Sequence, residues 1–329
     1  MIMLLKSEFQ PKLIYSPEYN INFFGVEKLH PFDSCKYGRS WNELFAIYGK
    51  QLQSLHILPS RSISHHELST VHTKSYLELL SSSRYLAQAL EMPPLALCPS
   101  RLIDKHILNP MRLATMGTLI AAKSAIKNGI GINLSGGYHH ASEANGEGFC
   151  IYSDIGIAIA SLRMEGTIQE TDQVVIIDLD AHQGNGLERI FLNDQNVKIF
   201  DVYNAEIYPN DGWAKRGIDL DIPLKSGTSD RKYIELLQEY LPSYLDSITP
   251  IRLAFYNAGT DIYCKDPLGK LDISAQGVLS RDILVFKTLL ELKIPFVMVL
   301  SGGYTKDSYL LIANSIRYLI DNTSGIPAP

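Results

Sequence analysis

Cysteine is scarce in this chain of 329 residues, and the four cysteines lie far apart, at positions 35, 98, 150 and 264. No C-x-x-C pair occurs, which argues against a cysteine zinc knuckle or a thioredoxin-type motif. Four separated thiols suit a reducing compartment. We therefore expect a cytoplasmic protein, with the nucleus or export to a host cell as alternatives.

Long apolar runs and an excess of positive charge are also lacking. No stretch approaches the roughly 18 apolar residues that cross a bilayer, so we expect no membrane span. The opening run MIMLLKSEFQ has neither the longer apolar core nor the small-residue cleavage site of a secretory signal. The formal net charge is −5, which offers no basic face for nucleic acid, and we expect no direct nucleic-acid binding. These features leave the oligomeric state open.

Apolar segments of two lengths alternate along the middle and the C-terminal part of the chain. Short runs rich in Val, Ile and Phe predict strands at Lys12–Tyr15, Gly131–Leu134, Gln173–Asp178, Val197–Val202, Leu253–Asn257 and Pro295–Leu300. Longer amphipathic segments predict helices at Met111–Lys127, Ile155–Met164, Asp230–Leu245, Ser274–Leu292 and Ser308–Ile320. We expect an α/β protein with one domain over residues 1–329, built on a central, mostly parallel sheet flanked by helices on both faces.

Chemically active side chains follow the predicted strands, at the sheet edge where open α/β proteins place their sites. Asp178, Asp180 and His182 stand at alternate positions, so they can share one side of an extended chain. The carboxylate of Asp180 and the imidazole of His182 can ligate one divalent cation. Asp261, after a later strand, is the best candidate for a third ligand. An Asp₂His set leaves a position open for water and substrate, as in catalytic zinc sites. Taken singly, a strand-end aspartate is explained equally well as a helix cap.

A tandem of histidines, His139-His140, follows the glycine-rich end of another predicted strand. Beside a metal, two imidazoles could act as base and acid in attack on a carbonyl, or as ligands. Each imidazole needs an acceptor behind it, and Asp178 and Asn185 are available. The other tandem, His65-His66, lies in a polar helical context, and we interpret it as surface.

A tyrosine follows the last predicted strand, after Gly302-Gly303. A phenol presented from a glycine turn can donate to a developing oxyanion, which makes Tyr304 a candidate catalytic group.

These segments together resemble the zinc-dependent histone deacetylase family, which has the arginase/deacetylase fold. The resemblance rests on S-G-G-Y-H-H, G-E-G-F-C-I-Y-S-D, D-L-D-A-H-Q-G-N-G, N-A-G-T-D and S-G-G-Y, in the family's order from about Tyr15 to about Ile320. The segments S-P-E-Y-N-I-N-F-F-G-V-E-K-L-H-P-F-D and D-V-Y-N-A-E-I-Y-P are similar to the class IV branch.

The resemblance implies a role for each matching residue. Zinc would be held by Asp180, His182 and Asp261. His140 matches the general base and acid, and His139 matches the histidine that gives electrostatic stabilisation near the leaving group. Asp178 stands behind His139, and Asn185 stands behind His140. Tyr304 matches the tyrosine that stabilises the transition state. The class I branch has Asp in place of Asn185, so His140 should be less basic here.

The resemblance also implies a substrate tunnel and a second cation. The tunnel walls match Gly148, Phe149, Tyr208 and Leu268. A potassium ion would lie beside the zinc, near Asp178, Asp180, His182, Asp201 and Val202. Asp201 stands where class I has Ser, so potassium could be held differently here.

We therefore expect a zinc-dependent protein-lysine deacylase that removes acetyl or longer fatty acyl groups from an acyl-lysine protein or peptide. One alternative is a small-molecule amide hydrolase such as an acetylpolyamine deacetylase. Polyamine-specific relatives carry Glu where this chain has Leu268, which argues against it. The other alternative is a catalytically silent acyl-lysine binding module, and it would be favoured by loss of a ligand or of the tyrosine.

Overall fold

One eight-stranded sheet runs through the protein. The computed structural model describes residues 9–248 and 250–326, so most of the N-terminal apolar run, residues 1–8, lies outside the described residues. The strands are β1 (Gln10–Ile14), β2 (His56–Ile57), β3 (Gly129–Asn133), β4 (Gln173–Asp178), β5 (Val197–Asn204), β6 (Leu220–Leu224), β7 (Ile251–Asn257) and β8 (Phe296–Val299). Their order is β2-β1-β3-β8-β7-β4-β5-β6, and every pair is parallel.

The predicted strands all occur, and the predictions of a parallel sheet and of an α/β fold are confirmed. The sequence did not reveal β2 and β6, the two outermost strands. β2 has only two residues, and β6 reads LDIPL with an alternating burial pattern. An edge strand is covered on fewer sides than a central one, so it lacks the continuous apolar run that marks β4 or β8.

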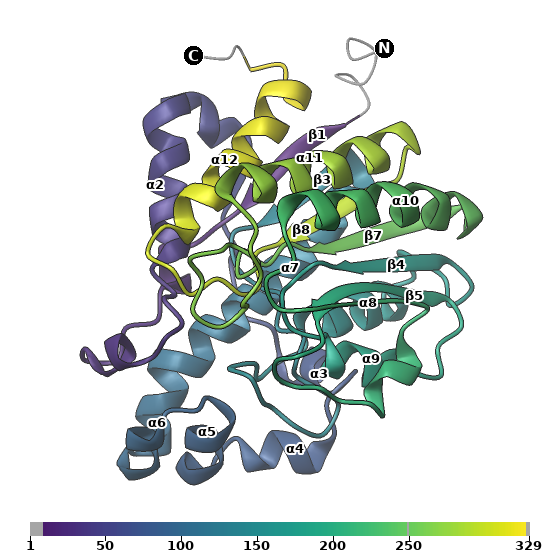
Figure 1. Cartoon of the computed structure of the whole chain (residues 1–329). Coiled ribbons are helices and arrows are strands. Elements are labelled where there is room, and N and C mark those ends of the chain that lie inside the picture. The colour runs from purple at the N-terminus through teal and green to yellow at the C-terminus, as the bar shows by residue number, and fades with distance from the viewer. Residues whose placement is uncertain (1–8, 249, 327–329) are drawn as a thin grey trace.

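Helices cover both faces of the sheet (Figure 1). On one face lie α2 (Lys36–Tyr48), α10 (Asp230–Ile248), α11 (Ala275–Glu291) and α12 (Ser308–Thr323). On the other face lie α7 (Asn109–Asn128), α8 (Asp154–Met164) and α9 (Asn185–Phe191). The five predicted helices correspond to α7, α8, α10, α11 and α12 within a few residues.

Short helices build the lower part of the molecule in Figure 1. They are α3 (His65–Leu68), α4 (Lys74–Leu79), α5 (Ser83–Ala89), α6 (Ser100–Ile103) and the π-helical turn η5 (Asp104–Leu108). Short 3-10 helices occur at η1 (Pro17–Tyr19), η2 (Val26–Leu29), η3 (Gly49–Ser54), η4 (Pro93–Leu97) and η6 (Ala214–Gly217). His65 and His66 are exposed on α3, as predicted.

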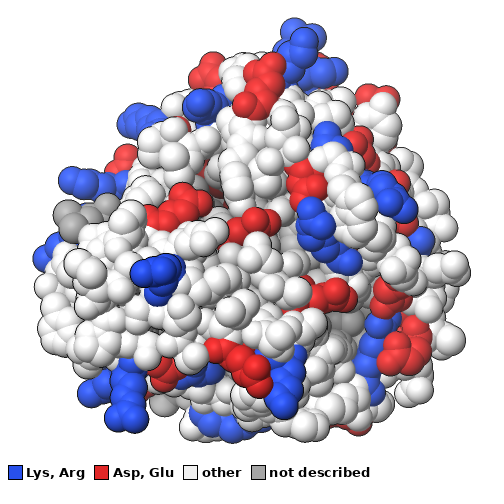
Figure 2. Space-filling view, turned by 90° about the horizontal axis from the view of Figure 1, so that it is seen from below, with Lys and Arg blue, Asp and Glu red and all other residues white. Residues whose placement is uncertain are grey.

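The core is the apolar sheet with the inner faces of its helices. Val174, Ile176, Phe255 and Val297 on the central strands are completely buried. No helix among the described residues is long and apolar enough to cross a membrane. Lysine, arginine and acidic side chains are interspersed on the face shown in Figure 2. The central strands therefore form a rigid platform whose carboxyl ends carry the loops described below.

A capping box at the start of α3 gives the fold a pH-dependent contact. Ser64 Oγ accepts from the backbone N–H of Glu67, and Glu67 Oε2 accepts from the backbone N–H of Ser64 at 2.7 Å. Arg61 also donates to both carboxylate oxygens of Glu67, at 2.6 and 2.7 Å. The hydrogen bonds from Arg61, followed by those from Ser64, lower the pKa of Glu67 from 4.5 to about 2.

Replacing Glu67 by Gln should lower the free energy of unfolding at pH 7 by about 1 kcal/mol, and the melting temperature should fall with it. Because the folded-state pKa is depressed, this stabilisation is present above about pH 4.5 and is lost as the pH falls towards about 2. Thermal melts at pH 7, 5 and 3.5 should therefore show the difference from wild type narrowing with acid. Glu78→Gln, at an exposed residue of the neighbouring α4, is the control. A pH-independent difference would contradict the assignment.

Candidate active site

The carboxyl ends of four adjacent strands, β3, β8, β7 and β4, bring the predicted site residues together. His139 and His140 follow β3, and Tyr304 follows β8. Asp261 follows β7, while Asp180 and His182 follow β4. These strands are neighbours in the sheet although their loops are up to about 160 residues apart in sequence, so parallel pairing creates the site.

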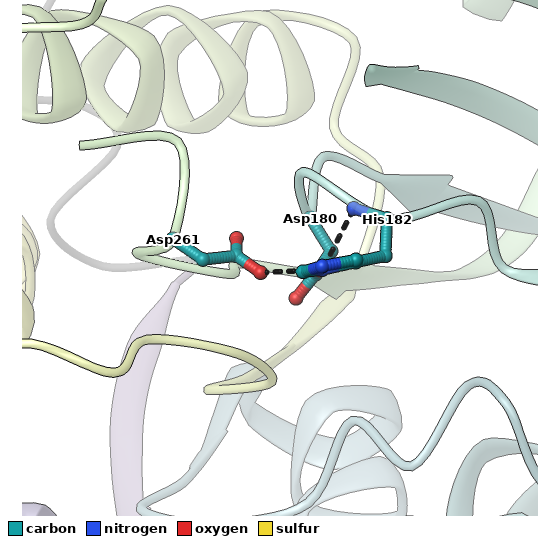
Figure 3. A group of neighbouring side chains, drawn as sticks. All are labelled: Asp180, His182 and Asp261. Atoms are coloured by element: carbon teal, nitrogen blue, oxygen red, sulfur yellow. Dashed lines mark hydrogen bonds and ion pairs between the residues drawn. The ribbon is translucent and has the colours of Figure 1, made fainter. Parts of the chain in front are cut away.

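Three of these side chains point toward one another (Figure 3). His182 Nδ1 lies 3.0 Å from Asp180 Oδ1 and 2.9 Å from Asp261 Oδ2. One ligand atom from each residue lies within 4.8 Å of the other two, and all three residues are buried. The second oxygen of each aspartate accepts a backbone hydrogen bond: Asp261 Oδ1 from the N–H of Ala181, and Asp180 Oδ2 from the N–H of Gly302. The inner oxygens are therefore held toward a common centre.

This donor set fits a divalent metal. Two carboxylates that are 1% and 0% exposed flank one imidazole nitrogen, and a single N–H cannot satisfy both. Burial and the charge of Asp180 raise the pKa of Asp261 to about 7. Burial lowers the pKa of His182, but its hydrogen bonds to both aspartates outweigh this and raise it to about 10. The cluster therefore attracts positive charge strongly, and one nitrogen with two carboxylate oxygens is a set that zinc accepts.

A glycine allows the last loop to approach this cluster. A Cβ on Gly302 would lie 2.3 Å from Asp261 Oδ2 and 2.6 Å from Asp180 Oδ2. Any side chain there would displace the carboxylates, so the S-G-G-Y segment needs glycine at this point.

The tandem histidines occupy two different environments. His139 Nδ1 lies 2.9 Å from Asp178 Oδ2, and the other oxygen of Asp178 accepts from Asn257 Nδ2. Burial lowers the pKa of His139, but the charges of Asp178 and Asp180 outweigh it and raise the pKa to about 9. His139 is therefore a cation at neutral pH.

His140 instead faces a neutral partner. Its Nδ1 lies 2.7 Å from Asn185 Oδ1. Burial, followed by the positive charges of His139 and His182, holds the pKa of His140 well below its usual value. His140 is therefore neutral at pH 7 and has a nitrogen able to accept a proton, while its neighbour is charged.

Tyr304 is positioned through its backbone. Its N–H donates to Asp266 Oδ2 at 2.7 Å, and Asp266 Oδ1 accepts from the N–H of Leu268 at 2.9 Å. The Tyr304 ring lies 6.2 Å from the ring of His182, between centroids. Burial and the charges of Asp261 and Asp180 hold its pKa well above 10, so the phenol keeps its proton.

A narrow cavity of about 30 Å³ lies between these groups and is lined by both histidines, Gly148, Phe149 and Tyr304. The ring of Tyr208 lies 5.1 Å from that of His140. Leu268 is half-buried, and its backbone N–H donates to Asp266, which also binds the N–H of Tyr304. The structure thus brings three of the four predicted tunnel residues into contact with the histidines or with Tyr304, and Leu268 joins them indirectly.

Two of the residues predicted for potassium, Asp201 and Val202, lie on the strand next to Asp178. Asp201 and Val202 are completely buried on β5, next to Asp178 in register. Asp201 Oδ2 accepts from the N–H of Gly184, and the Asp201 carboxyl also contacts the carboxyl of Glu188. Burial, followed by the charges of Asp178 and Glu188, raises the pKa of Asp201 well above its usual value.

Several residues that support the site escaped sequence reasoning. Lys36, completely buried on α2, donates to the carbonyls of Ser301 and Gly302 at 2.8 and 3.0 Å. Arg281, completely buried on α11, donates to the carbonyls of Leu179 and Gly259, in the two loops that carry the aspartates. The sequence signal for Arg281 is a charged residue inside a predicted amphipathic helix. This signal does not identify the hydrogen-bond acceptors of the side chain.

Asp154, at the start of α8, also supports the site. Its carboxylate accepts from the backbone N–H groups of Gly137 and Tyr138, at 3.0 and 2.8 Å. It therefore holds the turn that presents the two histidines.

Comparisons with known proteins identify the family of this chain. Residues 30–319 match the family described as the histone deacetylase domain. Histone deacetylase 2 of Arabidopsis thaliana is 44% identical over 309 residues, which cover 93% of this chain and 78% of that protein. Histone deacetylase 8 of Xenopus tropicalis is 25% identical over 279 residues, covering 80% and 72%. The crystal structure of the HDA15 HD domain has the same fold. The match has a TM-score of 0.74 and 19% sequence identity, and it extends over 98% of this chain and 91% of that chain.

Replacing Asp261 by Asn should abolish metal binding, because a charged ligand becomes a neutral one. Metal analysis should find about one divalent ion per wild-type chain and far less in the variant. The metal-free variant should melt no lower than metal-free wild type, since the repulsion between Asp261 and Asp180 is gone. Asp246→Asn, at an exposed position of α10, is the control. Full metal content in Asp261→Asn would contradict the assignment.

Proposed function

We propose that this chain, which belongs to the histone deacetylase family, hydrolyses acyl groups from lysine side chains with a zinc ion at Asp180, His182 and Asp261. The observation that supports this best is the buried cluster of these three residues beside His139, His140 and Tyr304. Zinc in such a site polarises the acyl carbonyl and lowers the pKa of a bound water.

In this proposal His140 carries out the proton transfers, and His139 provides electrostatic stabilisation. His140 is neutral, and it takes a proton from the attacking water and later gives it to the lysine nitrogen. The bond between the acyl carbon and that nitrogen breaks, so the amine leaves and the carboxylic acid remains. His139 keeps its charge beside Asp178 and stabilises the negative charge that develops during attack.

Tyr304 supplies a hydrogen bond to the oxyanion. Its phenol stays protonated because of burial and the nearby carboxylates, and it borders the cavity that contains the histidines. We propose that this donor is preorganised before charge develops, because a preorganised donor stabilises an oxyanion most.

Replacing Tyr304 by Phe should lower turnover about 10²–10³-fold, the usual effect of losing one oxyanion donor. The variant should keep its zinc and its melting temperature, since only a hydroxyl is removed. Rates on an acetyl-lysine peptide, with metal content measured in parallel, test this. Tyr240→Phe, on the exposed side of α10, is the control. A nearly unchanged turnover number would show that Tyr304 only packs.

Further assignments extend this proposal. We place the chain in the class IV branch, on its motifs at 16–33 and 201–209. We also propose that potassium binds near Asp178, Asp201 and Val202, which the two buried carboxyl groups paired in register on β4 and β5 support. The substrate is an acyl-lysine protein or peptide. The cytoplasm is the proposed location, since all four cysteines are unpaired.

Two neighbouring cavities support a long acyl chain. An apolar cavity of about 410 Å³ lies beside the narrow one and shares five lining residues with it. Those residues are Ile21, Phe32, Met111, Phe149 and Tyr304. Its size lies within the range of small-molecule pockets, and each buried methylene contributes about 0.8 kcal/mol. We propose that a fatty acyl tail extends through the narrow cavity into the larger one.

A myristoyl-lysine peptide should therefore show a higher kcat/KM than its acetyl twin. Rates on matched acetyl, butyryl, octanoyl and myristoyl peptides test this, with an acetylpolyamine as the small-molecule comparison. Met111→Trp should narrow the passage and lower the myristoyl rate more than the acetyl rate, while Met164→Trp, at an exposed position, should change neither. A clear preference for acetyl would overturn the chain-length claim and leave the zinc mechanism intact.

A further inference from the structure

A carboxylate lies behind the Asn185 partner of His140. His140 Nδ1 is 2.7 Å from Asn185 Oδ1, and Asn185 Nδ2 donates to Glu147 Oε1 at 2.5 Å. Asn185 is 1% exposed, whereas Glu147 is half-buried at the edge of a polar pocket beside Tyr208. A continuous row of hydrogen bonds therefore runs from the imidazole to a surface carboxylate.

The backbone holds Glu147 in this place. The N–H of Cys150 donates to the Glu147 carbonyl at 2.9 Å, which closes a tight turn. Gly148, inside that turn, has φ 53°, and a Cβ there would lie 2.4 Å from Cδ2 of His140. The turn therefore packs directly on the imidazole that the row of hydrogen bonds reaches.

The row determines how the Asn185 amide is oriented. An amide has a donor end and an acceptor end, and a carboxylate only accepts. The NH₂ of Asn185 must therefore face Glu147, and its oxygen must face His140. That oxygen in turn requires the proton of neutral His140 on Nδ1, which leaves the Nε2 lone pair available for the substrate side.

We propose that Glu147 is a positioning residue that fixes the Asn185 amide and, through it, the tautomer of His140. The proposal rests on the proposed function for its kinetic consequence but not for the tautomer itself. Glu147 also supplies negative charge behind His140, in a chain whose residue 185 is the neutral Asn. The charge lies one side chain further out, beyond the amide.

Glu147→Gln is the sharpest change, because a Gln amide can present either end to Asn185 and no longer selects one orientation. The kcat should fall about 10- to 100-fold, as is usual when a group that orients a metal-site histidine is altered. KM, zinc content and melting temperature should stay close to wild type. Glu143→Gln, at an exposed position of the same loop, is the matched control and should change nothing.

The same substitution should reverse its effect when residue 185 is Asp. In Asn185→Asp, two carboxylates would face each other across a contact that is 2.5 Å in the wild type. Adding Glu147→Gln to that variant restores a donor opposite Asp and should raise kcat. A role limited to holding the loop would give the same sign in both backgrounds, so equal or absent effects would overturn the proposal.

A readout without substrate separates this proposal from the proposed function. ¹⁵N shifts of histidine in the zinc-loaded protein should show His140 protonated on Nδ1 in wild type and a mixture of tautomers in Glu147→Gln. If wild type hydrolyses no acyl-lysine peptide but this change appears, the proposed function fails and the role of Glu147 stands. If wild type is active and Glu147→Gln alters neither kcat nor the His140 signals, the role of Glu147 is wrong.

Discussion

Two buried carboxylates, Asp180 and Asp261, impose the main constraint on this protein. They converge on one imidazole with ligand atoms within 4.8 Å, where the repulsion of two like charges is on the order of 3 kcal/mol. The backbone N–H of Ala181 donates to one oxygen of Asp261, and the backbone N–H of Gly302 donates to one oxygen of Asp180. The remaining oxygens face a common centre, so the folded chain has a site whose electrostatics are completed by a cation.

Two buried cations hold the loops that carry this charge. Arg281 joins the loops after β4 and β7 through their carbonyls, and Lys36 binds the carbonyls of the loop after β8. Burial lowers the pKa of Lys36 to about 8, and the charges of Asp261 and Asp180 limit the drop. Because the contacts are to backbone, the loops are positioned by the sheet and by these cations together. The site geometry is therefore set by contacts within the chain itself.

The sequence predicted the central strands of the sheet. It also predicted the candidate site residues that directly follow those strands. Continuous apolar runs marked β4 and β8, while the alternating edge strand β6 was missed because half of its side chains face solvent. The grouping of Asp180, His182 and Asp261 followed from parallel strands ending at one edge. Lys36 and Glu147 were not predictable, since each acts through a tertiary contact that leaves no local pattern. Their partners lie 265 and 38 residues away in the chain.

The contact of Lys36 with the loop after β8 has a consequence for how the protein is made. Lys36 precedes its carbonyl partner Ser301 by 265 residues, so it leaves the ribosome well before that partner is made. At about 5–20 residues per second, the lysine waits roughly 13–50 s before its partners exist. During that interval the hydrogen bonds that hold the Lys36 ammonium in its buried place cannot form. The final packing of α2 is thus tied to synthesis of β8 and of the loop that follows it.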